Sequence, residues 1–420
     1  MRAAILCIGT ELSTNLVKDS NAEFLRNKLL DKGILTEYTM FVPDDKEAII
    51  QALRFLIQKE ELRLVVVSGG LGPTEDDITR EAVAETLKRE LVFLPQAWEE
   101  IRKIYFSIRK KEPSENNKKQ ALIPQGALML QNRVGTAPGF LIQEGDKKIF
   151  VIPGVPQEVE FFWHYIDEQI SNPQPSFFKT ETLKLCAIGE SELASQLQDF
   201  LVDLPSGISP AFIPRSGEIW FYLYAFRNPL PEENQKVQQI LESIKQRFKD
   251  RLFSTYADTL EEAVGQLLRE HRLTIATAES CTGGLLANRI TNVPGSSTYF
   301  KRGYVVYSNQ SKADDLNVPL AVIHRHGAVS EEVASLLAQN VAQRAGSDIG
   351  VGITGIAGPG GGSELKPVGL VYIGISWGKH LEVHRYQFHG ARTTIKFRTT
   401  QEALSQLFLL LSKRCLDNGE

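Results

Sequence analysis

The hydrophobic pattern of the first part of the chain alternates between short apolar runs and stretches with helical spacing. Residues 3–8, 36–42 and 64–68 are short runs of apolar side chains, as expected for strands buried on both faces. Between them, residues 21–30 and 46–58 repeat apolar positions at the spacing of one helix face. Strands that alternate with helices of this length predict a parallel sheet covered by helices.

A glycine-rich turn, residues 69–77, follows the strand predicted at 64–68 and precedes a helix predicted at 78–87. Its glycines let backbone N–H groups approach a ligand closely, and the start of a helix carries partial positive charge. Both features favour phosphate binding. Thr74 is predicted to cap the helix, with Asp77 as the acid of a capping box.

Acidic side chains crowd the same turn, at Glu75, Asp76 and Asp77. Bare carboxylates repel phosphate, and a divalent cation would resolve the conflict, because Mg²⁺ binds one or two carboxylates together with substrate phosphates. The alternative is that the acids only complement the helix dipole. Glu11 follows the first predicted strand, so it is expected to share a crevice with the turn at the carboxyl edge of the sheet.

The middle of the chain changes in character. Residues 171–176 are a linker by composition. Residues 177–253 alternate strands and helices on a smaller scale and offer no catalytic constellation, which predicts a structural or spacing role. The chain is therefore predicted to form three domains, residues 1–170, 171–253 and 254–420.

The last predicted domain repeats the alternation of strands and helices. Its predicted strands are residues 273–278, 303–307 and 349–354, followed by a hairpin of residues 368–377 and 381–388. Its predicted helices are residues 260–269, 285–291, 331–345 and 393–411. A turn of small residues, 279–284, joins its first strand to a helix, so this domain is expected to be a second α/β unit.

Composition narrows the classes of function. The chain has 420 residues, more than one ordinary domain holds, and a formal charge of −4, which gives no field for non-specific nucleic-acid binding. Its four cysteines include no C-x-x-C pair, which argues against a zinc site or a disulfide framework and fits a reducing cytoplasm. No apolar run is long enough to span a membrane, and the N-terminus lacks the pattern of a signal peptide.

Three familiar patterns fail on their context. Residues 350–355 fit G-x-G-x-x-G, but no helix is predicted after them, so a dinucleotide fingerprint is rejected. Residues 374–378 fit G-x-S-x-G within a strand-turn-strand, which is not a nucleophile elbow. His324 and His326 are predicted to be an exposed loop pair rather than metal ligands.

Hydroxyl side chains gather in the small-residue turns of the last domain, at Ser280, Thr282, Ser296, Ser297 and Thr354. A serine nucleophile needs a base, and no histidine occurs in these turns. Lys312 is the alternative base, because the positive end of its predicted helix disfavours its charge and lowers its pKa. Tyr307 is a candidate proton relay. The bland alternative is that serines in turns only form caps.

Five motifs in chain order carry a resemblance to a known family: residues 69–77, 153–158, 279–284, 307–312 and 355–361. They resemble the CinA family (competence/damage-inducible protein) over nearly the whole chain. The resemblance implies an N-terminal three-layer molybdopterin-binding-like domain, associated with metal-dependent ADP-ribose pyrophosphatase activity, and a small central KH-like α+β domain. It also implies a C-terminal three-layer α/β amidase domain, which converts nicotinamide mononucleotide and water to nicotinate mononucleotide and ammonia.

The resemblance also implies roles for individual residues. In the amidase, Ser297 is expected to be the nucleophile, with Ser280 as the runner-up or an oxyanion donor. Lys312 and Tyr307 are expected to handle protons, and Arg392 to hold the nucleotide phosphate. Further substrate-binding positions are Thr282, Gly283, Thr354, Gly358, Gly69, Gly70, Gly72, Thr74 and Asn132. A divalent metal ion, Mg²⁺ or similar, is expected among Asp76, Asp77, Glu11 and Glu158, and no cofactor is expected in the amidase.

Two stretches depart from the family pattern. Residues 13–15, Ser-Thr-Asn, stand where the family usually has a leucine and a glycine, which affects the ligand contacts of the first loop. Residues 189–192 do not form a G-x-x-G loop, so RNA binding through the KH-like domain is not expected.

The leading interpretation is a bifunctional, cytoplasmic enzyme of pyridine-nucleotide recycling. It is expected to act on nicotinamide mononucleotide and ADP-ribose as a homodimer, without a membrane or a direct nucleic-acid partner. One alternative is an accessory protein of DNA uptake that holds a pterin or nucleotide without cleaving it. Another is a scaffold with one inactive site.

Overall fold

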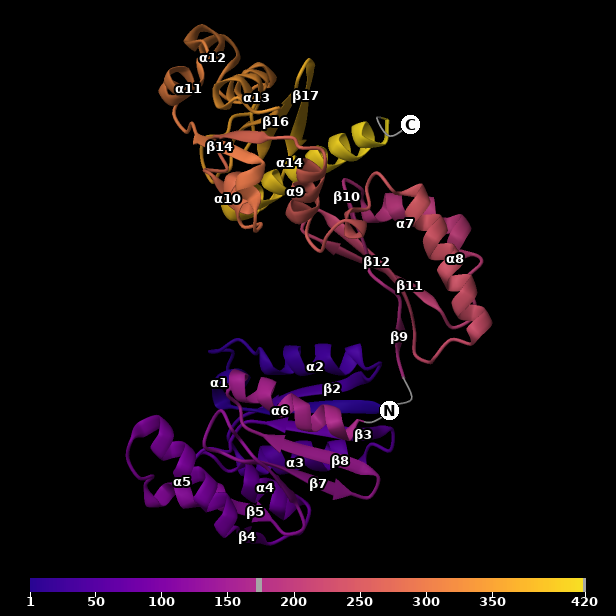
Figure 1. The fold of residues 1–420 in the computed structure, drawn as a ribbon, viewed down its shortest axis with the longest axis vertical. Helices are drawn as coiled ribbons and strands as arrows, with labels where there is room; N and C mark the ends of the chain where they lie inside the picture. The colour runs from indigo at the N-terminus through magenta and orange to yellow at the C-terminus, as the bar shows by residue number, and fades with distance from the viewer. Residues whose placement is uncertain (171–175, 418–420) are drawn as a thin grey trace. The chain divides into compact units, whose positions relative to one another are not determined.

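The computed structural model describes residues 1–170 and 176–417, so the linker predicted at 171–176 lies almost entirely outside the described residues. The chain divides into two compact units, Met1–Phe178 with Ala225–Pro229, and Lys179–Tyr224 with Leu230–Glu420 (Figure 1). The predicted α/β class is confirmed in both units. The predicted boundaries of three domains stay a prediction.

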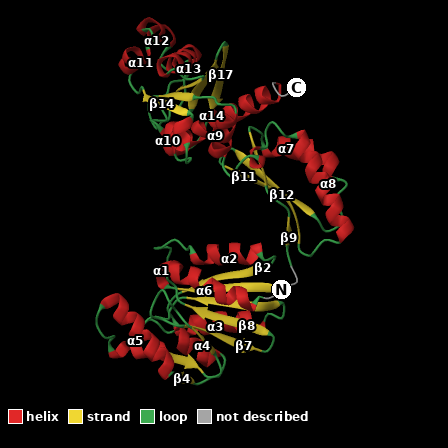
Figure 2. Ribbon diagram, viewed as in Figure 1, coloured by secondary structure: helices red, strands yellow, loops and turns green. Residues whose placement is uncertain are grey.

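The first unit is built on a six-stranded sheet of order β2-β1-β3-β8-β7-β6 (Figure 2). Its strands are β1 (Arg2–Ile8), β2 (Leu35–Val42), β3 (Leu62–Ser68), β6 (Leu128–Leu130), β7 (Gly139–Glu144) and β8 (Lys147–Ile152). The pairs from β2 to β8 are parallel, whereas β7 and β6 are added antiparallel. The carboxyl ends of the four parallel strands therefore meet at one edge.

Helices cover both faces of this sheet. α2 (Asn21–Asp31) and α6 (Pro156–Gln169) pack on one face, and α3 (Lys46–Gln58) and α4 (Thr79–Thr86) pack on the other. Val65 and Val66 of β3 accordingly belong to opposite cores, as the apolar run predicts. The remaining elements are α1 (Thr10–Ser13), β4 (Leu91–Phe93), α5 (Pro95–Arg109), the 3₁₀ helix η1 (Glu115–Ala121) and β5 (Leu122–Pro124).

The second unit begins with a small α+β part. Its strands are β9 (Phe178–Lys179), β10 (Leu183–Cys186), β11 (Ser209–Arg215) and β12 (Glu218–Ala225), and its helices are α7 (Glu190–Leu201) and α8 (Pro231–Arg247). β12 lies between β10 and β11, and both pairs are antiparallel. One face of β12 is buried through Ile219, Phe221 and Leu223, so the strand shows the alternation of a half-buried sheet.

The larger part of the second unit is a five-stranded sheet of order β14-β13-β15-β16-β17. Its strands are β13 (Ile275–Glu279), β14 (Phe300–Val305), β15 (Ile349–Gly355), β16 (Leu370–Trp377) and β17 (His380–Gln387). β13 is central and parallel to both β14 and β15. The predicted hairpin is confirmed as the antiparallel pair β16–β17.

Helices again form two outer layers. α9 (Leu260–Glu270) and α14 (Arg392–Asp417) pack on one face, and α11 (Asn309–Leu316), α12 (Leu320–His326) and α13 (Glu331–Ala345) pack on the other. The short elements are η2 (Phe253–Thr255), α10 (Leu285–Thr291) and η3 (Ser296–Thr298). The predicted loop for His324 and His326 is wrong, because both lie in α12, where His326 Nδ1 is 2.8 Å from Glu332 Oε1.

Candidate functional site

The carboxyl edge of the second unit's large sheet brings three separate segments together. Ser280 follows the end of central strand β13, and Thr354 stands near the end of β15. Lys312 belongs to α11, which follows β14 after a short connection. Because β13 is parallel to both neighbours, the segments that follow all three strands emerge at the same edge.

Ser280 and Lys312 form a buried pair. Lys312 Nζ lies 3.1 Å from Ser280 Oγ and also donates to the backbone oxygen of Val306 at 2.8 Å. The lysine side chain is 1% exposed, and none of the described carboxylates pairs with it. Burial lowers the pKa of Lys312, an effect opposed by the neighbouring Cys281. Burial therefore makes the ammonium form of Lys312 less favourable than that of an exposed lysine, which is the direction that a general base beside an alcohol requires.

Glu279, which the sequence analysis did not single out, holds the turn that carries Ser280. Its carboxylate is 1% exposed and accepts hydrogen bonds from the backbone N–H groups of Leu286 at 3.0 Å and Ala287 at 2.8 Å. The turn between strand and helix is thereby tied to the first residues of α10, where a negative charge is favourable. An acid at the end of an apolar strand, before a small-residue turn, is the signal that identifies it.

Cys281 is next to Ser280 but does not compete as a nucleophile. Burial raises the pKa of its thiol to about 12, although the ammonium charges of Lys312 and Lys396 oppose the rise. At neutral pH the sulfur therefore stays protonated, and the thiol is the unreactive form of cysteine.

Tyr307 and Arg392 form a second pair at this edge. Arg392 donates to the Tyr307 hydroxyl at 2.7 Å and to the backbone oxygen of Gly358 at 2.6 Å. The Tyr307 hydroxyl therefore bonds to Arg392, and its expected role as a proton relay stays a prediction. Thr354 is buried and donates to the backbone oxygen of Ala328 at 2.7 Å, so it anchors a neighbouring loop.

Ser297 lies at the other edge of the sheet. It belongs to η3, which precedes β14. Two residues later, the backbone oxygen of Tyr299 accepts a hydrogen bond from Ile275 N, at the start of β13, at 2.8 Å. The length of β13, five residues or about 16 Å, therefore separates the edge of Ser297 from that of Ser280. This geometry contradicts Ser297 as the partner of Lys312. A position before a strand and a position after it lie at opposite ends, however similar their turn residues are.

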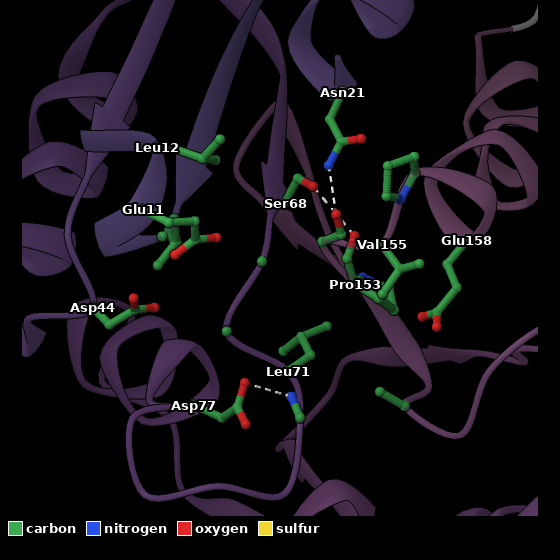
Figure 3. A pocket seen from close by; sticks show the side chains of 18 of the residues that line it. Glu11, Leu12, Asn21, Asp44, Ser68, Leu71, Asp77, Pro153, Val155 and Glu158 are labelled. Carbon is green, nitrogen blue, oxygen red and sulfur yellow. Dashed lines mark hydrogen bonds between the residues drawn. The ribbon is translucent and has the colours of Figure 1, made fainter. Parts of the chain in front are cut away.

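The first unit has a cavity of about 560 Å³ at the carboxyl edge of its sheet. It is lined by the β1–α1 turn, the glycine-rich turn 69–77 and residues 153–158 (Figure 3). Gly69 and Gly70 have positive φ, and a Cβ on Gly69 would lie 2.2 Å from Ile8 O. The close packing of this turn against β1 therefore requires glycine.

Asp77 organises the glycine-rich turn from inside. Its carboxylate accepts from the backbone N–H groups of Gly72 and Thr74, each at 2.8 Å, and from the Thr74 hydroxyl. The dashed line from Asp77 in Figure 3 marks its bond with the backbone N–H of Gly72. The predicted N-cap at Thr74 is wrong, because α4 begins only at Thr79 and the residue before it, Ile78, caps without a side-chain bond. The acid folds the loop instead of capping the helix.

The predicted metal ligands line one cavity but do not converge. Asp77 is committed to its own loop, and Glu158 accepts from Asn132 Nδ2 at 3.0 Å while burial raises the pKa of Glu158. Glu11 and Glu158 stand on opposite sides of the cavity in Figure 3. Within residues 1–170 and 176–417, no three His, Cys, Asp or Glu side chains form a metal-binding group. The expected divalent ion, which these four acids would surround together with the pyrophosphate, stays a prediction.

Asn132 is a structural centre of its loop. Its Nδ2 donates to Ala137 O at 2.9 Å, and its Oδ1 accepts from the N–H groups of Val134 and Gly135, each at 2.9 Å. It is 2% exposed, so it shapes the wall that presents Glu158. In this geometry, Asn132 would act on a substrate through Glu158, which it holds, and not by direct contact.

Two residues of this cavity were missed by the sequence analysis. Asp44 follows β2 and accepts from Thr10 N at 2.8 Å, and Asn21 at the start of α2 donates to Gly154 O at 2.6 Å. Both join segments that are distant in sequence. A carboxylate two residues after a parallel strand is the signal that marks Asp44.

Three family models cover the chain in succession. Residues 4–170 match the probable molybdopterin binding domain, residues 180–254 the damage-inducible protein CinA KH domain, and residues 257–411 the CinA C-terminal domain. Among the described helices, none has the length and apolar character that a bilayer crossing demands.

Similar proteins extend over the full chain. A competence-damage inducible protein of Moorella thermoacetica is 41% identical, with 99% of this chain and 100% of that protein covered. One from Clostridium acetobutylicum is 37% identical over 96% and 98% of the two chains. The crystal structure of a competence/damage inducible protein from Agrobacterium tumefaciens is 38% identical over 35% of this chain and 91% of that one, with a TM-score of 0.35. The chain therefore belongs to the CinA family.

Proposed function

We propose that the second unit is an amidase that converts nicotinamide mononucleotide and water to nicotinate mononucleotide and ammonia. The observation that carries the proposal is the 3.1 Å contact between Lys312 Nζ and Ser280 Oγ in a buried site that disfavours the ammonium form. A serine beside a neutral amine is a competent nucleophile without histidine.

The reaction proceeds in two halves. Ser280 Oγ bonds to the carboxamide carbon while Lys312 accepts the hydroxyl proton, and the C–N bond then breaks as Lys312 returns that proton to the departing ammonia. Water, activated by the again neutral Lys312, hydrolyses the acyl ester and restores Ser280. Glu279 keeps the nucleophile in place because its bonds to α10 fix the turn.

Ammonia release from nicotinamide mononucleotide tests this proposal. Ser280→Ala is expected to lower kcat/KM at least about 10³-fold, because the nucleophile is removed. Ser297→Ala is the matched control, since the same atom is deleted at the opposite edge of the sheet, and its activity should stay within about twofold of the parent protein. A large loss in Ser297→Ala with none in Ser280→Ala would contradict the assignment.

A second activity is proposed for the first unit, the hydrolysis of the pyrophosphate bond of ADP-ribose. The supporting observation is a cavity that combines a glycine-rich turn with Glu11, Asp76 and Glu158 on its lining. A hydrogen bond from Thr74 lowers the pKa of Asp76, so this acid is charged at neutral pH. Because the acids form no closed cage, a divalent ion there would take part of its coordination from substrate phosphates.

Turnover of ADP-ribose with and without a divalent salt tests this second activity. Asp77→Ala is expected to abolish it by releasing the 72–74 turn. Hydrolysis in excess chelator would contradict the requirement for a cation. Calorimetry separates the non-catalytic alternative, because tight binding of a pterin without turnover would favour an accessory role in DNA uptake.

A further inference from the structure

Arg392 is an exposed residue whose guanidinium bonds to two other segments of the chain. One nitrogen donates to Gly358 O at 2.6 Å and another to the Tyr307 hydroxyl at 2.7 Å. These bonds fix the start of the glycine run 358–362 against the segment before α11. Because the Arg392 guanidinium bonds to both of these loops, its role is to hold them in place around the site.

Lys396 is the next cation on the same face of α14, four residues after Arg392. Its ammonium lies 3.5 Å from the point that a Cβ on Gly283 would occupy, so it stands over the turn that carries Ser280. The side chain is half-buried, and it has no hydrogen-bond or ion-pair partner anywhere in the described parts of the chain. A cation placed at a catalytic turn without a counter-ion is suited to an anionic group of the ligand.

The same turn contains another unsatisfied polar group. Thr282 is fully buried, and its hydroxyl has no hydrogen-bond partner among the described residues. Buried hydroxyls are normally paired. The Ser280–Gly284 turn therefore combines an unpaired hydroxyl with the unpaired ammonium of Lys396.

The spacing fits a mononucleotide. Gly283 N donates to Ser280 O at 3.1 Å, which makes these residues the ends of a four-residue turn with Cα atoms within about 7 Å. The Lys396 ammonium lies 3.5 Å from the Cβ position of Gly283, which is the end of this turn opposite to Ser280. A ligand with a carboxamide at one end and a phosphate at the other would span from the nucleophile to this cation.

We infer that Lys396 binds the 5′-phosphate of the amide substrate and so selects nucleotides over nucleosides, whereas Arg392 is a positioning residue for the surrounding loops. The inference rests on the proposed amidase function and names the specificity of that same site. It moves the phosphate contact from Arg392, where the family resemblance places it, to a lysine that the resemblance does not assign.

Binding to the full-length Ser280→Ala protein tests the inference without turnover. Calorimetry with nicotinamide mononucleotide and with nicotinamide riboside, which lacks the phosphate, is compared before and after Lys396→Gln. Loss of one charge-assisted contact is expected to weaken mononucleotide binding about 10- to 100-fold and to leave riboside binding unchanged. Lys396→Arg should restore most of the affinity. Lys379→Gln is the matched control, on the exposed turn between β16 and β17.

The other outcomes are decisive as well. Equal weakening of both ligands would show a structural role for Lys396, and unchanged mononucleotide binding or no binding of either ligand would also overturn the inference. The proposed function fails separately: if the parent protein releases no ammonia while Lys396→Gln still weakens only the mononucleotide, the phosphate site stands and the amidase does not. Arg392→Gln should weaken both ligands, as expected for a residue that orders loops.

Discussion

Lys312 is a buried cationic side chain whose contacts are neutral oxygens. Such a site penalises the ammonium form, because desolvation is not repaid by an opposite charge. In the proposed mechanism, the same penalty prepares the amine to accept a proton from Ser280. Burial of Lys312 therefore lowers the stability of the fold while it favours the proposed proton transfer.

The pH dependence of deamidation follows from the lowered pKa of Lys312. Activity is expected to rise with pH as the amine loses its proton, and to level off below the ordinary lysine value of 10.5. The kcat/KM profile for nicotinamide mononucleotide measures this midpoint. A midpoint at the ordinary value would show that burial does not tune the base.

Replacement of Lys312 by methionine is expected to remove activity and to stabilise the second unit by about 1 kcal/mol at neutral pH. The folded state holds the lysine with a lowered pKa, so the unfolded state binds more protons, and the parent protein gains stability as pH rises toward 10.5. The advantage of Lys312→Met should accordingly shrink at high pH. Urea unfolding at two pH values measures both effects, with Lys379→Met as the exposed control.

Candidate residues were predictable where one short motif contained them. Ser280 was singled out by turn composition and Lys312 by its position at a helix start, and the two side chains are in contact. The hydrogen bond between Tyr307 and Arg392 joins residues 85 positions apart in the sequence, and no local sequence pattern predicts it. Ser297 lies at the edge opposite to Lys312, and turn composition does not say at which edge of a sheet a turn lies.

Glycines of the large sheet explain the false dinucleotide pattern at residues 350–355. A Cβ on Gly350 would lie 2.0 Å from Ala338 O, and one on Gly352 would lie 2.5 Å from Ala338 N. Gly374 of β16 meets the same helix, with 2.5 Å to Ala334 O. These glycines allow α13 to approach β15 and β16 at backbone distance, so their function is packing.

Gly352→Ala is therefore expected to destabilise the second unit by about 1–3 kcal/mol, because the added methyl overlaps the backbone of α13. Gly360→Ala is the matched control, since nothing lies within 4 Å of its Cβ position. Thermal unfolding followed by circular dichroism compares the two. Equal stability of the variants would contradict the close approach of helix and sheet.

Elements with a strong period were predicted well. The two α/β units, the hairpin and α13 at 331–345 follow from strand runs and helical spacing. The starts of helices were harder to predict from the sequence. Thr74 does not cap α4, because Asp77 bonds to the backbone N–H of Thr74 within the preceding turn. The single-sequence pattern does not distinguish an acid that caps a helix from one that folds a loop.

At the scale of the whole molecule, the two proposed sites belong to different compact units, each with its own core. Sites that belong to separate units and share no partners are expected to behave additively. Asp77→Ala should keep deamidation within about twofold of the parent protein, and Ser280→Ala should keep ADP-ribose hydrolysis to the same degree. Parallel assays of both variants measure this. A loss of both activities in either variant would reveal coupling between the units.

The expected homodimer stays a prediction, because surface patterns in one sequence do not identify a partner copy. Sedimentation equilibrium of the full chain measures the oligomeric state. A mass equal to the 46.9 kDa chain at all concentrations would contradict the expectation.

No imidazole contacts Ser280 or Lys312 in the described chain, where the lysine bonds only to hydroxyl and backbone oxygens. Compounds that inactivate an enzyme by alkylating a catalytic histidine therefore have no such target at Ser280 and Lys312. If Ser280 is the nucleophile that we propose, a boronic acid or sulfonyl fluoride attached to a pyridine ring would react with its oxygen beside the Lys312 amine. Inhibitors of this site should therefore carry an electrophile that reacts with the serine oxygen. Reactive probes directed at histidine would not label the site.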